Sequence, residues 1–194
     1  MLEKLPKILA LNKNYEPIEW LDYQDFAIKH AKGNILASLG QHEAVLHGGT
    51  NAKTGLQTTL AMDSIVVVDS SVSPYSYKKS TPALSNDALF KRDFAICAYC
   101  GQTYKERVLT RDHVLPLSKG GPDIWTNVVT ACSNCNSYKD NKTPEQAGMK
   151  LLYVPYAPTA LEAFILSERK ILADQMSFLL AMLPKHSRLH SKFN

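Results

Sequence analysis

The sequence predicts a mixed α+β fold. Three observations support this class: several short runs rich in β-branched residues, one long apolar stripe with helical period, and two close cysteine pairs in the middle of the chain. The 194 residues suffice to bury a hydrophobic core. A bound metal would therefore stabilise one segment and would not be needed for the whole fold. We expect three parts: an N-terminal α+β module with a linker over 1–82, a cysteine-containing domain over 83–150, and a C-terminal helix with a basic tail over 151–194.

The N-terminal module is predicted to combine strands with one helix. A helix is expected between Tyr23 and Lys32, ended by Gly33. The polar, proline-containing stretch 70–82 has the composition of a linker. Alternating or continuous apolar runs predict strands at 7–12, 42–47, 57–62 and 64–69.

The segment 159–183 predicts the longest helix of the chain. Thr159 and Glu162 have the spacing of a capping box. Apolar residues extend beyond a single stripe, so this helix either packs against the body of the protein or forms a homodimer with a second copy. A second helix start is expected at Thr143-Pro144-Glu145, and the last residues are expected to be a frayed tail.

Charge and hydropathy indicate which partners the sequence permits, nucleic acid or membrane. The formal charge is +4, with the excess in the second half of the chain, which permits a nucleic acid partner without requiring one. No apolar run reaches the length of a membrane span, and charges and a proline interrupt the start where a signal peptide has its apolar core. We therefore expect a cytoplasmic protein with no membrane partner.

The cysteines predict a structural zinc site. Cys97 and Cys100 are two residues apart, and Cys132 and Cys135 repeat this spacing after 31 intervening residues. Two such turns supply the tetrahedral sulfur shell that structural zinc prefers. Disulfides, free thiols and a thiol redox site are the alternatives, but redox chemistry would need one Cys-x-x-Cys opening a helix in a βαβ pattern. A four-thiolate site leaves no position for water, so any chemistry lies elsewhere.

Polar residues between the cysteine pairs are the candidates for that chemistry. A short β-type run, Val108 to Thr110, leads into Arg111-Asp112-His113, and a Pro-Ser-Gly loop follows. Asn127 and Asn136 come next in the sequence. Each has an ordinary structural explanation: a turn cap for Asp112, a half-buried strand position for His113, a helix N-cap for Asn127 and a turn for Asn136.

Taken together, these residues resemble the HNH endonucleases. The ordered segments that carry the resemblance are CAYC, RDHVLPLSKGG, WTNVVTAC and CSNCN, with Lys139 three residues further on. The resemblance implies a ββα-metal core, in which a β-hairpin and a helix surround one catalytic ion, fastened here by the four-cysteine zinc site. It is specific over residues 97–143.

The resemblance also implies residue roles. His113 would be the general base that takes a proton from water, for which an imidazole is suited near neutral pH. Asn127 would orient His113 or its loop. Asp112 and Asn136 would hold Mg²⁺ or Mn²⁺, with Ni²⁺ as a further possibility, because oxygen ligands suit these ions. Lys139, Arg111 and Lys119 are candidates for contacts with phosphate.

The predicted function is metal-dependent hydrolysis of DNA. The alternative from another class is a non-catalytic zinc module that binds nucleic acid, which has the same zinc site but gives no reason for Asp112, His113 and Asn136 to occupy these positions. Trp125 is expected to pack beneath the loop.

Overall fold

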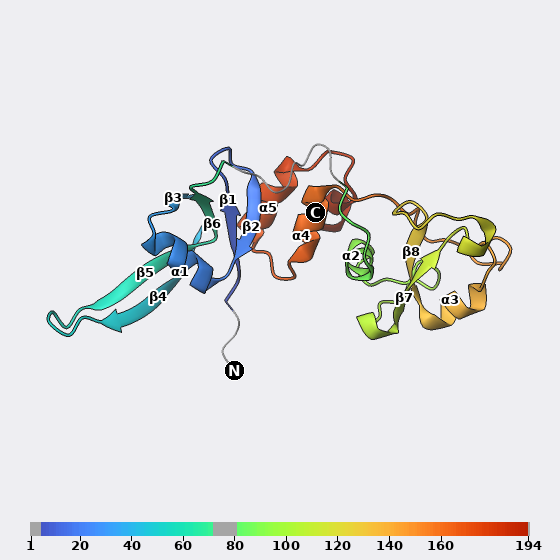
Figure 1. Ribbon diagram of the computed structural model, residues 1–194, viewed down its shortest axis with the longest axis horizontal. Coiled ribbons are helices and arrows are strands. Elements are labelled where there is room, and N and C mark those ends of the chain that lie inside the picture. The colour runs from blue at the N-terminus through green and yellow to red at the C-terminus, as the bar shows by residue number, and fades with distance from the viewer. Residues whose placement is uncertain (1–4, 72–80, 194) are drawn as a thin grey trace. The chain divides into compact units, whose positions relative to one another are not determined.

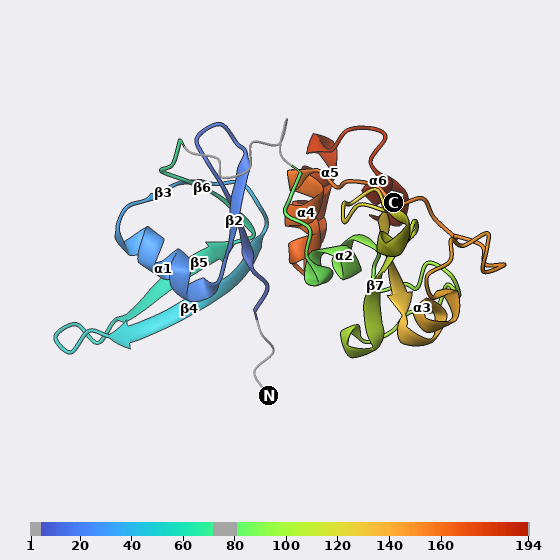
Figure 2. The same cartoon turned by 45° about the vertical axis from the view of Figure 1, so that its right-hand side comes forward.

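The computed structural model of the protein describes residues 5–71 and 81–193. The chain divides into two compact units, residues 1–76 with 168–194 and residues 77–167 (Figures 1 and 2). Both units mix strands with helices, which confirms the α+β class. No helix within the described part of the chain is long and apolar enough to cross a bilayer.

The first unit is built on a four-stranded sheet with strand order β2-β1-β6-β3. Neighbouring β1 and β6 are parallel, and the two outer pairs are antiparallel. The strands are β1 (Ile8–Leu11), β2 (Pro17–Leu21), β3 (Ile35–Ser38) and β6 (Ile65–Val68), and a separate hairpin joins β4 (His42–Thr50) to β5 (Gln57–Asp63). The four predicted strands are confirmed, whereas β2 and β3 were not predicted: β2 contains Pro17, and β3 is short and largely exposed.

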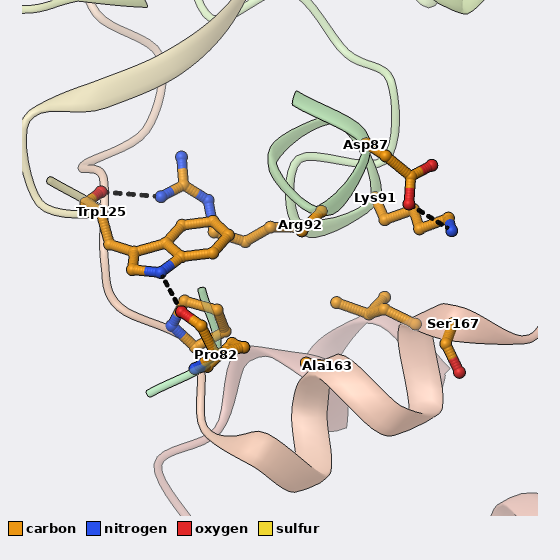
Figure 3. A pocket seen from close by; sticks show the side chains of 10 residues that line it. Pro82, Asp87, Lys91, Arg92, Trp125, Ala163 and Ser167 are labelled. Carbon is orange, nitrogen blue, oxygen red and sulfur yellow. Dashed lines mark hydrogen bonds and ion pairs between the residues drawn. The ribbon is translucent and has the colours of Figure 1, made fainter. Parts of the chain in front are cut away.

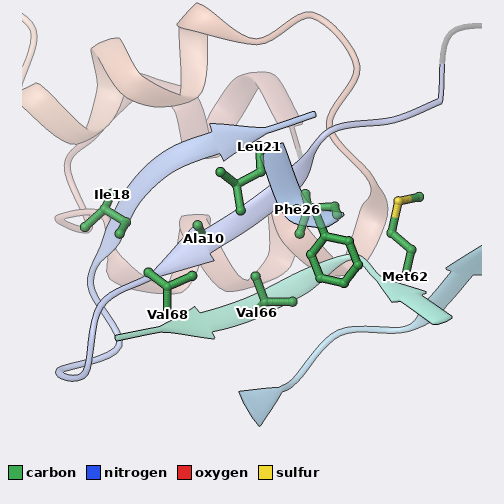
Figure 4. Packing of buried hydrophobic residues seen from close by; sticks show 8 residues of the cluster. Ala10, Ile18, Leu21, Phe26, Met62, Val66 and Val68 are labelled. Atoms are coloured by element: carbon green, nitrogen blue, oxygen red, sulfur yellow. The ribbon is translucent and has the colours of Figure 1, made fainter. Parts of the chain in front are cut away.

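One helix and the sheet enclose the core of this unit. Helix α1 (Tyr23–Ala31) begins where the Asp22 carboxylate accepts two backbone N–H groups, and it ends before Gly33, whose φ is +70°. This confirms the predicted helix and its end. Phe26 projects from α1 into the apolar cluster drawn in Figure 4, whose buried members are Ile8, Ala10, Ile18, Leu21, Phe26, Met62, Val66 and Val68.

The second unit surrounds an antiparallel hairpin. Strands β7 (Leu109–His113) and β8 (Val128–Cys132) pair, and α3 (Ser133–Lys139) packs on both. Helix α2 (Asn86–Arg92) begins at Ser85, whose hydroxyl accepts the Ala88 N–H. Helix α4 (Ala160–Ser167) and the 3₁₀ turns Glu106–Val108 and Leu117–Lys119 complete the unit.

Buried Arg92 joins the parts of this unit. Its guanidinium pairs with Asp93 and donates to the carbonyl oxygens of Trp125 and Tyr156 at 2.9 and 2.8 Å. The Trp125 indole lies 5.4 Å from this guanidinium and donates to the Pro82 carbonyl at 2.7 Å (Figure 3). Trp125 is 6% exposed and belongs to a buried apolar cluster, so it is a packing residue as expected.

The prediction of one helix over 159–183 is wrong. Helix α4 ends at Ser167, and a separate helix, α5 (Ala173–Met182), follows. Between them the Glu168 carboxylate accepts the N–H groups of Arg169 and Lys170 and pairs with Lys7, which favours a turn. The capping box of Thr159 and Glu162 at the start of α4 is confirmed.

The break in this helix lies at a boundary between the two units. It falls at residue 168, where the chain passes from the second unit to the first. The tail is ordered as α6 (Arg188–Phe193) with Leu189 buried, and Thr143-Pro144-Glu145 begins a series of turns and not a helix. Most of the predicted linker, 70–82, lies outside the described residues.

Candidate active site beside a four-cysteine cluster

The four cysteines meet at one point. The sulfur atoms of Cys97, Cys100, Cys132 and Cys135 all lie within 4.8 Å of one another. Tetrahedral zinc with Zn–S bonds of about 2.3 Å would place its sulfur ligands about 3.8 Å apart, so only a small contraction separates this cluster from a zinc shell. The cluster is therefore consistent with a structural metal such as zinc.

Local backbone structure directs the thiols of each cysteine pair toward a common point. Cys97 opens a turn that the Gly101 N–H closes on the Cys97 carbonyl at 3.0 Å, and Gly101 has a φ of +73°. Cys132 ends β8 and Cys135 lies in the first turn of α3. A metal held by the four cysteines would fix the turn at Cys97–Cys100 to the junction of β8 and α3.

The pKa values of three of the thiols are shifted in different directions. Burial raises the pKa of Cys97 and of Cys135. Burial also acts on Cys100, but hydrogen bonds from the Gln102 N–H, Tyr104 and the other cysteines outweigh it and lower its pKa to about 7. A bound cation favours the thiolate form of all four, so metal binding would release protons.

The hairpin separates two sets of polar side chains. Asp112 lies opposite Val129 and His113 opposite Val128, and successive side chains of β7 point to opposite faces. Thr110 and Asp112 face α3, whereas Arg111 and His113 contact the loop before β8. We call these the inner and the outer face of β7.

On the inner face, Asp112 belongs to a buried ion pair. The Lys139 ammonium lies 2.9 Å from Asp112 Oδ1 and donates to the His113 carbonyl at 2.9 Å. The Tyr99 hydroxyl donates to the other oxygen of Asp112, and burial together with this carboxylate raises the Tyr99 pKa. The side chains of Lys139 and Asp112 are 1% and 5% exposed, so they form part of the interior.

Lys139 is buried rather than at the surface, where a phosphate contact was expected to place it. Its side chain is 1% exposed, and its ammonium is directed to Asp112 and to a backbone carbonyl. Its charge acts instead to hold the end of β7 against α3.

Asn136 is the other inner-face candidate. Its amide Nδ2 donates to the Thr110 hydroxyl at 2.9 Å. No hydrogen bond from the described residues reaches its Oδ1, which leaves that oxygen for another partner. Asn136 and Asp112 line one open groove along β7 together with Arg111, His113, Pro116, Leu117, Ser118, Lys139, Asp140 and Asn141.

On the outer face, His113 is engaged by a carboxylate. His113 Nε2 lies 2.9 Å from Asp123 Oδ1, and Arg111 donates to both oxygens of Asp123 at 2.9 and 2.8 Å. Hydrogen bonds from Arg111, and then from His113, lower the Asp123 pKa. Arg111 Nε donates to Asn86 of α2 at 2.9 Å, which fixes the other side of the guanidinium.

Asn127 holds the loop that follows His113. Its side-chain oxygen accepts the Leu115 N–H at 2.9 Å, and its amide donates to the carbonyl oxygens of Leu115 and Pro122. A Cβ on Gly121 would lie 1.8 Å from the Leu115 oxygen, so only glycine fits this close approach. Asn127 therefore acts on the loop, and its side-chain hydrogen bonds go to Leu115 and Pro122 and not to the imidazole.

Lys119 lies on this loop, and its ammonium group already has a hydrogen-bond partner there. Its ammonium donates to Gln146 Oε1 at 2.5 Å, and the residue is exposed. Of the three cations predicted to meet phosphate, Arg111 and Lys119 thus reach the surface and Lys139 does not.

The cysteine cluster, the hairpin β7–β8 and α3 lie within one segment that matches a known protein family. Residues 97–152 match the HNH endonuclease family. The match covers the whole hairpin, α3 and all four cysteines, and we call it the HNH segment. It suggests nuclease activity and implies a nucleic acid substrate. A comparison with curated proteins finds no match.

The donor set of the inner face fits a hard divalent ion. Asn136 offers a free amide oxygen, and each Asp112 oxygen has a lone pair beyond the one that accepts from Lys139 or Tyr99. The Lys139 ammonium already neutralises part of the charge, so an ion held here would bind weakly.

Three residues of the site were not predicted from the sequence. Tyr99 stands between two cysteines and Asp123 stands in a Gly-Pro loop, so neither had a distinguishing pattern. Asp140 lines the groove beside Asn136 and has a φ of +53°, a conformation that a side chain rarely adopts and that the sequence does not reveal.

Proposed function

We propose that this protein is a metal-dependent endonuclease that hydrolyses phosphodiester bonds of DNA in the groove along β7. The observation that carries the proposal is His113 in one open groove with Asp112 of β7 and Asn136 of α3, within the HNH segment. An imidazole at such a position is suited to take a proton from water near neutral pH.

The residues have separate parts in this reaction. His113 takes a proton from water, the water oxygen bonds to phosphorus, and the P–O3′ bond breaks. The 3′ oxygen gains a proton from solvent, which leaves a 5′-phosphate and a 3′-hydroxyl. Asp112 and Asn136 would hold Mg²⁺, Mn²⁺ or Ni²⁺, which supplies positive charge to the phosphate and the leaving oxygen. Asn127 positions His113 through the loop, and Arg111 contacts phosphate.

The proposal is tested by plasmid cleavage with His113→Ala. We expect the wild-type protein to cut plasmid with added Mg²⁺ or Mn²⁺ and the variant to lose at least about 100-fold in rate. Zinc content should stay unchanged and thermal unfolding should change little, because the hydrogen bond that the described residues show for the His113 ring is to the half-exposed Asp123. His47→Ala, on an exposed position of the hairpin β4–β5, is the matched control. Undiminished cutting by His113→Ala would refute the assignment of the base.

The alternative function, a non-catalytic zinc module that binds nucleic acid, is favoured by one observation. Asp112 is buried and engaged by Lys139 and Tyr99, as in a purely structural network. This alternative predicts salt-dependent binding of DNA with no cleavage at any divalent ion. Isothermal titration of the metal with wild type and Asn136→Ala separates the two, because only the nuclease needs a second cation site besides the cysteines.

A further inference from the structure

We infer that Arg111 binds a DNA phosphate at a subsite beside His113, and that the Asp123 carboxylate occupies this subsite until the nucleic acid displaces it. The inference rests on the proposed function and deepens it. It assigns a ligand position and its internal competitor to the outer face of β7.

The geometry of the two donors is that of an anion site. Arg111 and His113 lie two positions apart on one face of β7, and both line the open groove. Their nitrogen atoms converge on one carboxylate, with Arg111 Nη1 at 2.9 and 2.8 Å and His113 Nε2 at 2.9 Å. A phosphodiester presents two oxygens in a similar arrangement, and arginine is suited to bind it.

Arg111 does not depend on Asp123 alone for its position, because Asn86 holds it through Nε. Lys139 holds the His113 backbone through its carbonyl. Loss of the Asp123 carboxylate would therefore leave a subsite whose guanidinium and His113 backbone stay in place.

Asp123 itself is easily displaced. Its side chain is 49% exposed, whereas those of Arg111 and His113 are 19% and 17% exposed. Exposed ion pairs contribute little to stability, so a phosphate can compete for the guanidinium. The Asn127 amide holds the preceding residue by donating to the Pro122 carbonyl. A change of the Asp123 rotamer is therefore enough to release the guanidinium, and the loop can stay in place.

The consequence concerns His113. In the structure its Nε2 is occupied by Asp123, on the side where the ring lines the groove. Entry of a phosphate moves the carboxylate away and turns this nitrogen toward the substrate. Substrate binding and exposure of the imidazole are thus one event.

The test measures binding of a short DNA duplex by Asp123→Asn, without added divalent ion so that no cleavage occurs. We expect a dissociation constant about fivefold lower than that of wild type, because the internal competitor has lost its charge. Asp87→Asn is the control: it removes the same charge from an exposed pair with Lys91 on α2. It should change affinity much less than Asp123→Asn does.

A second probe separates this inference from the nuclease proposal. Inorganic phosphate is titrated into both proteins while NMR follows the Arg111 Nε–H and the His113 ring, with larger shifts at lower phosphate expected in Asp123→Asn. Equal affinity of wild type and variant for both probes overturns the inference, even if plasmid cleavage succeeds. Weaker binding by the variant also overturns it and assigns Asp123 to positioning alone. Tighter phosphate binding without any plasmid cleavage would support the subsite and refute the nuclease.

Discussion

The two faces of β7 carry neighbouring residues of the same motif in opposite environments. On the inner face, Asp112 and Lys139 form an ion pair with side chains 5% and 1% exposed. On the outer face, Asp123 is 49% exposed where it meets Arg111 and His113. One strand thus separates a buried, fixed charge pair from an open one.

The difference shows how the segment can be rigid and accessible at once. Buried charges without partners are costly, so the inner pair holds α3 and the end of β7 in one arrangement. The outer pair costs little to break, so its residues are free to meet a ligand. We expect disturbances of the inner face to lower stability and disturbances of the outer face to alter binding.

Removal of the metal should have the largest effect. Structural zinc contributes about 10 kcal/mol or more to the folding of small zinc domains. A metal on the four cysteines would join the turn at Cys97–Cys100 to the junction of β8 and α3, the helix that carries Lys139. A zinc chelator should therefore unfold the HNH segment while the first unit keeps its own core. Amide hydrogen exchange before and after chelation measures this, and equal protection of β7 in both states would contradict it.

Acid should act in the same direction as the chelator. Zinc binds thiolates, so protons compete with it, and affinity falls as pH drops. Cys100, whose pKa is lowered to about 7, should keep its thiolate to lower pH than Cys97 and Cys135, whose pKa values are raised. Release of zinc as pH is lowered, followed with a colorimetric zinc indicator, checks this, and zinc content that stays constant down to the acid unfolding of the first unit would contradict it.

Lys139→Met should have the next largest effect on the inner face. The substitution keeps much of the side-chain volume but leaves Asp112 buried with a charge and without its cation. Loss of one partner of a buried pair costs about 3–5 kcal/mol. Urea unfolding should show this loss, with Lys142→Met at an exposed position of the same region as the control. A decrease in the free energy of unfolding of less than about 1 kcal/mol would contradict the prediction, because that value is typical of exposed ion pairs.

The sequence predicted the parts of the molecule that have a local signal. The cysteine spacing located the zinc cluster, and the order of Asp112, His113, Asn127 and Asn136 located the hairpin, its loop and α3. The caps at Ser85 and Thr159 were also readable, because a cap is a contact over three residues.

What the sequence could not predict depends on contacts between distant residues. The pairing of Asp112 with Lys139 spans 27 positions, so a lysine that matched a motif was expected at the surface. The break between α4 and α5 follows from Glu168, which caps the next turn and pairs with Lys7 at the other end of the chain. An apolar stripe continues through such a break and does not reveal it.

Tyr99→Phe should weaken the inner face without removing its charge balance. The hydroxyl donates to Asp112, and its loss leaves one oxygen of a buried carboxylate without that donor. A hydrogen bond to a charged group contributes about 1.5–3 kcal/mol, so we expect a loss in that range, smaller than for Lys139→Met. Urea unfolding gives the value, and Tyr138→Phe, at a position 69% exposed on α3, should leave stability unchanged.

Arg111→Met should have the smallest effect on stability and so completes the comparison of the two faces. Its partner Asp123 is half exposed and can turn to water when the guanidinium is lost. Breaking such a pair costs about 0–1 kcal/mol. Binding of a DNA duplex should weaken and lose part of its dependence on salt, because one phosphate contact disappears. If Arg111→Met instead destabilised the protein as strongly as Lys139→Met, the outer face would be structural too, and the separation of a fixed inner pair from a displaceable outer pair would fail.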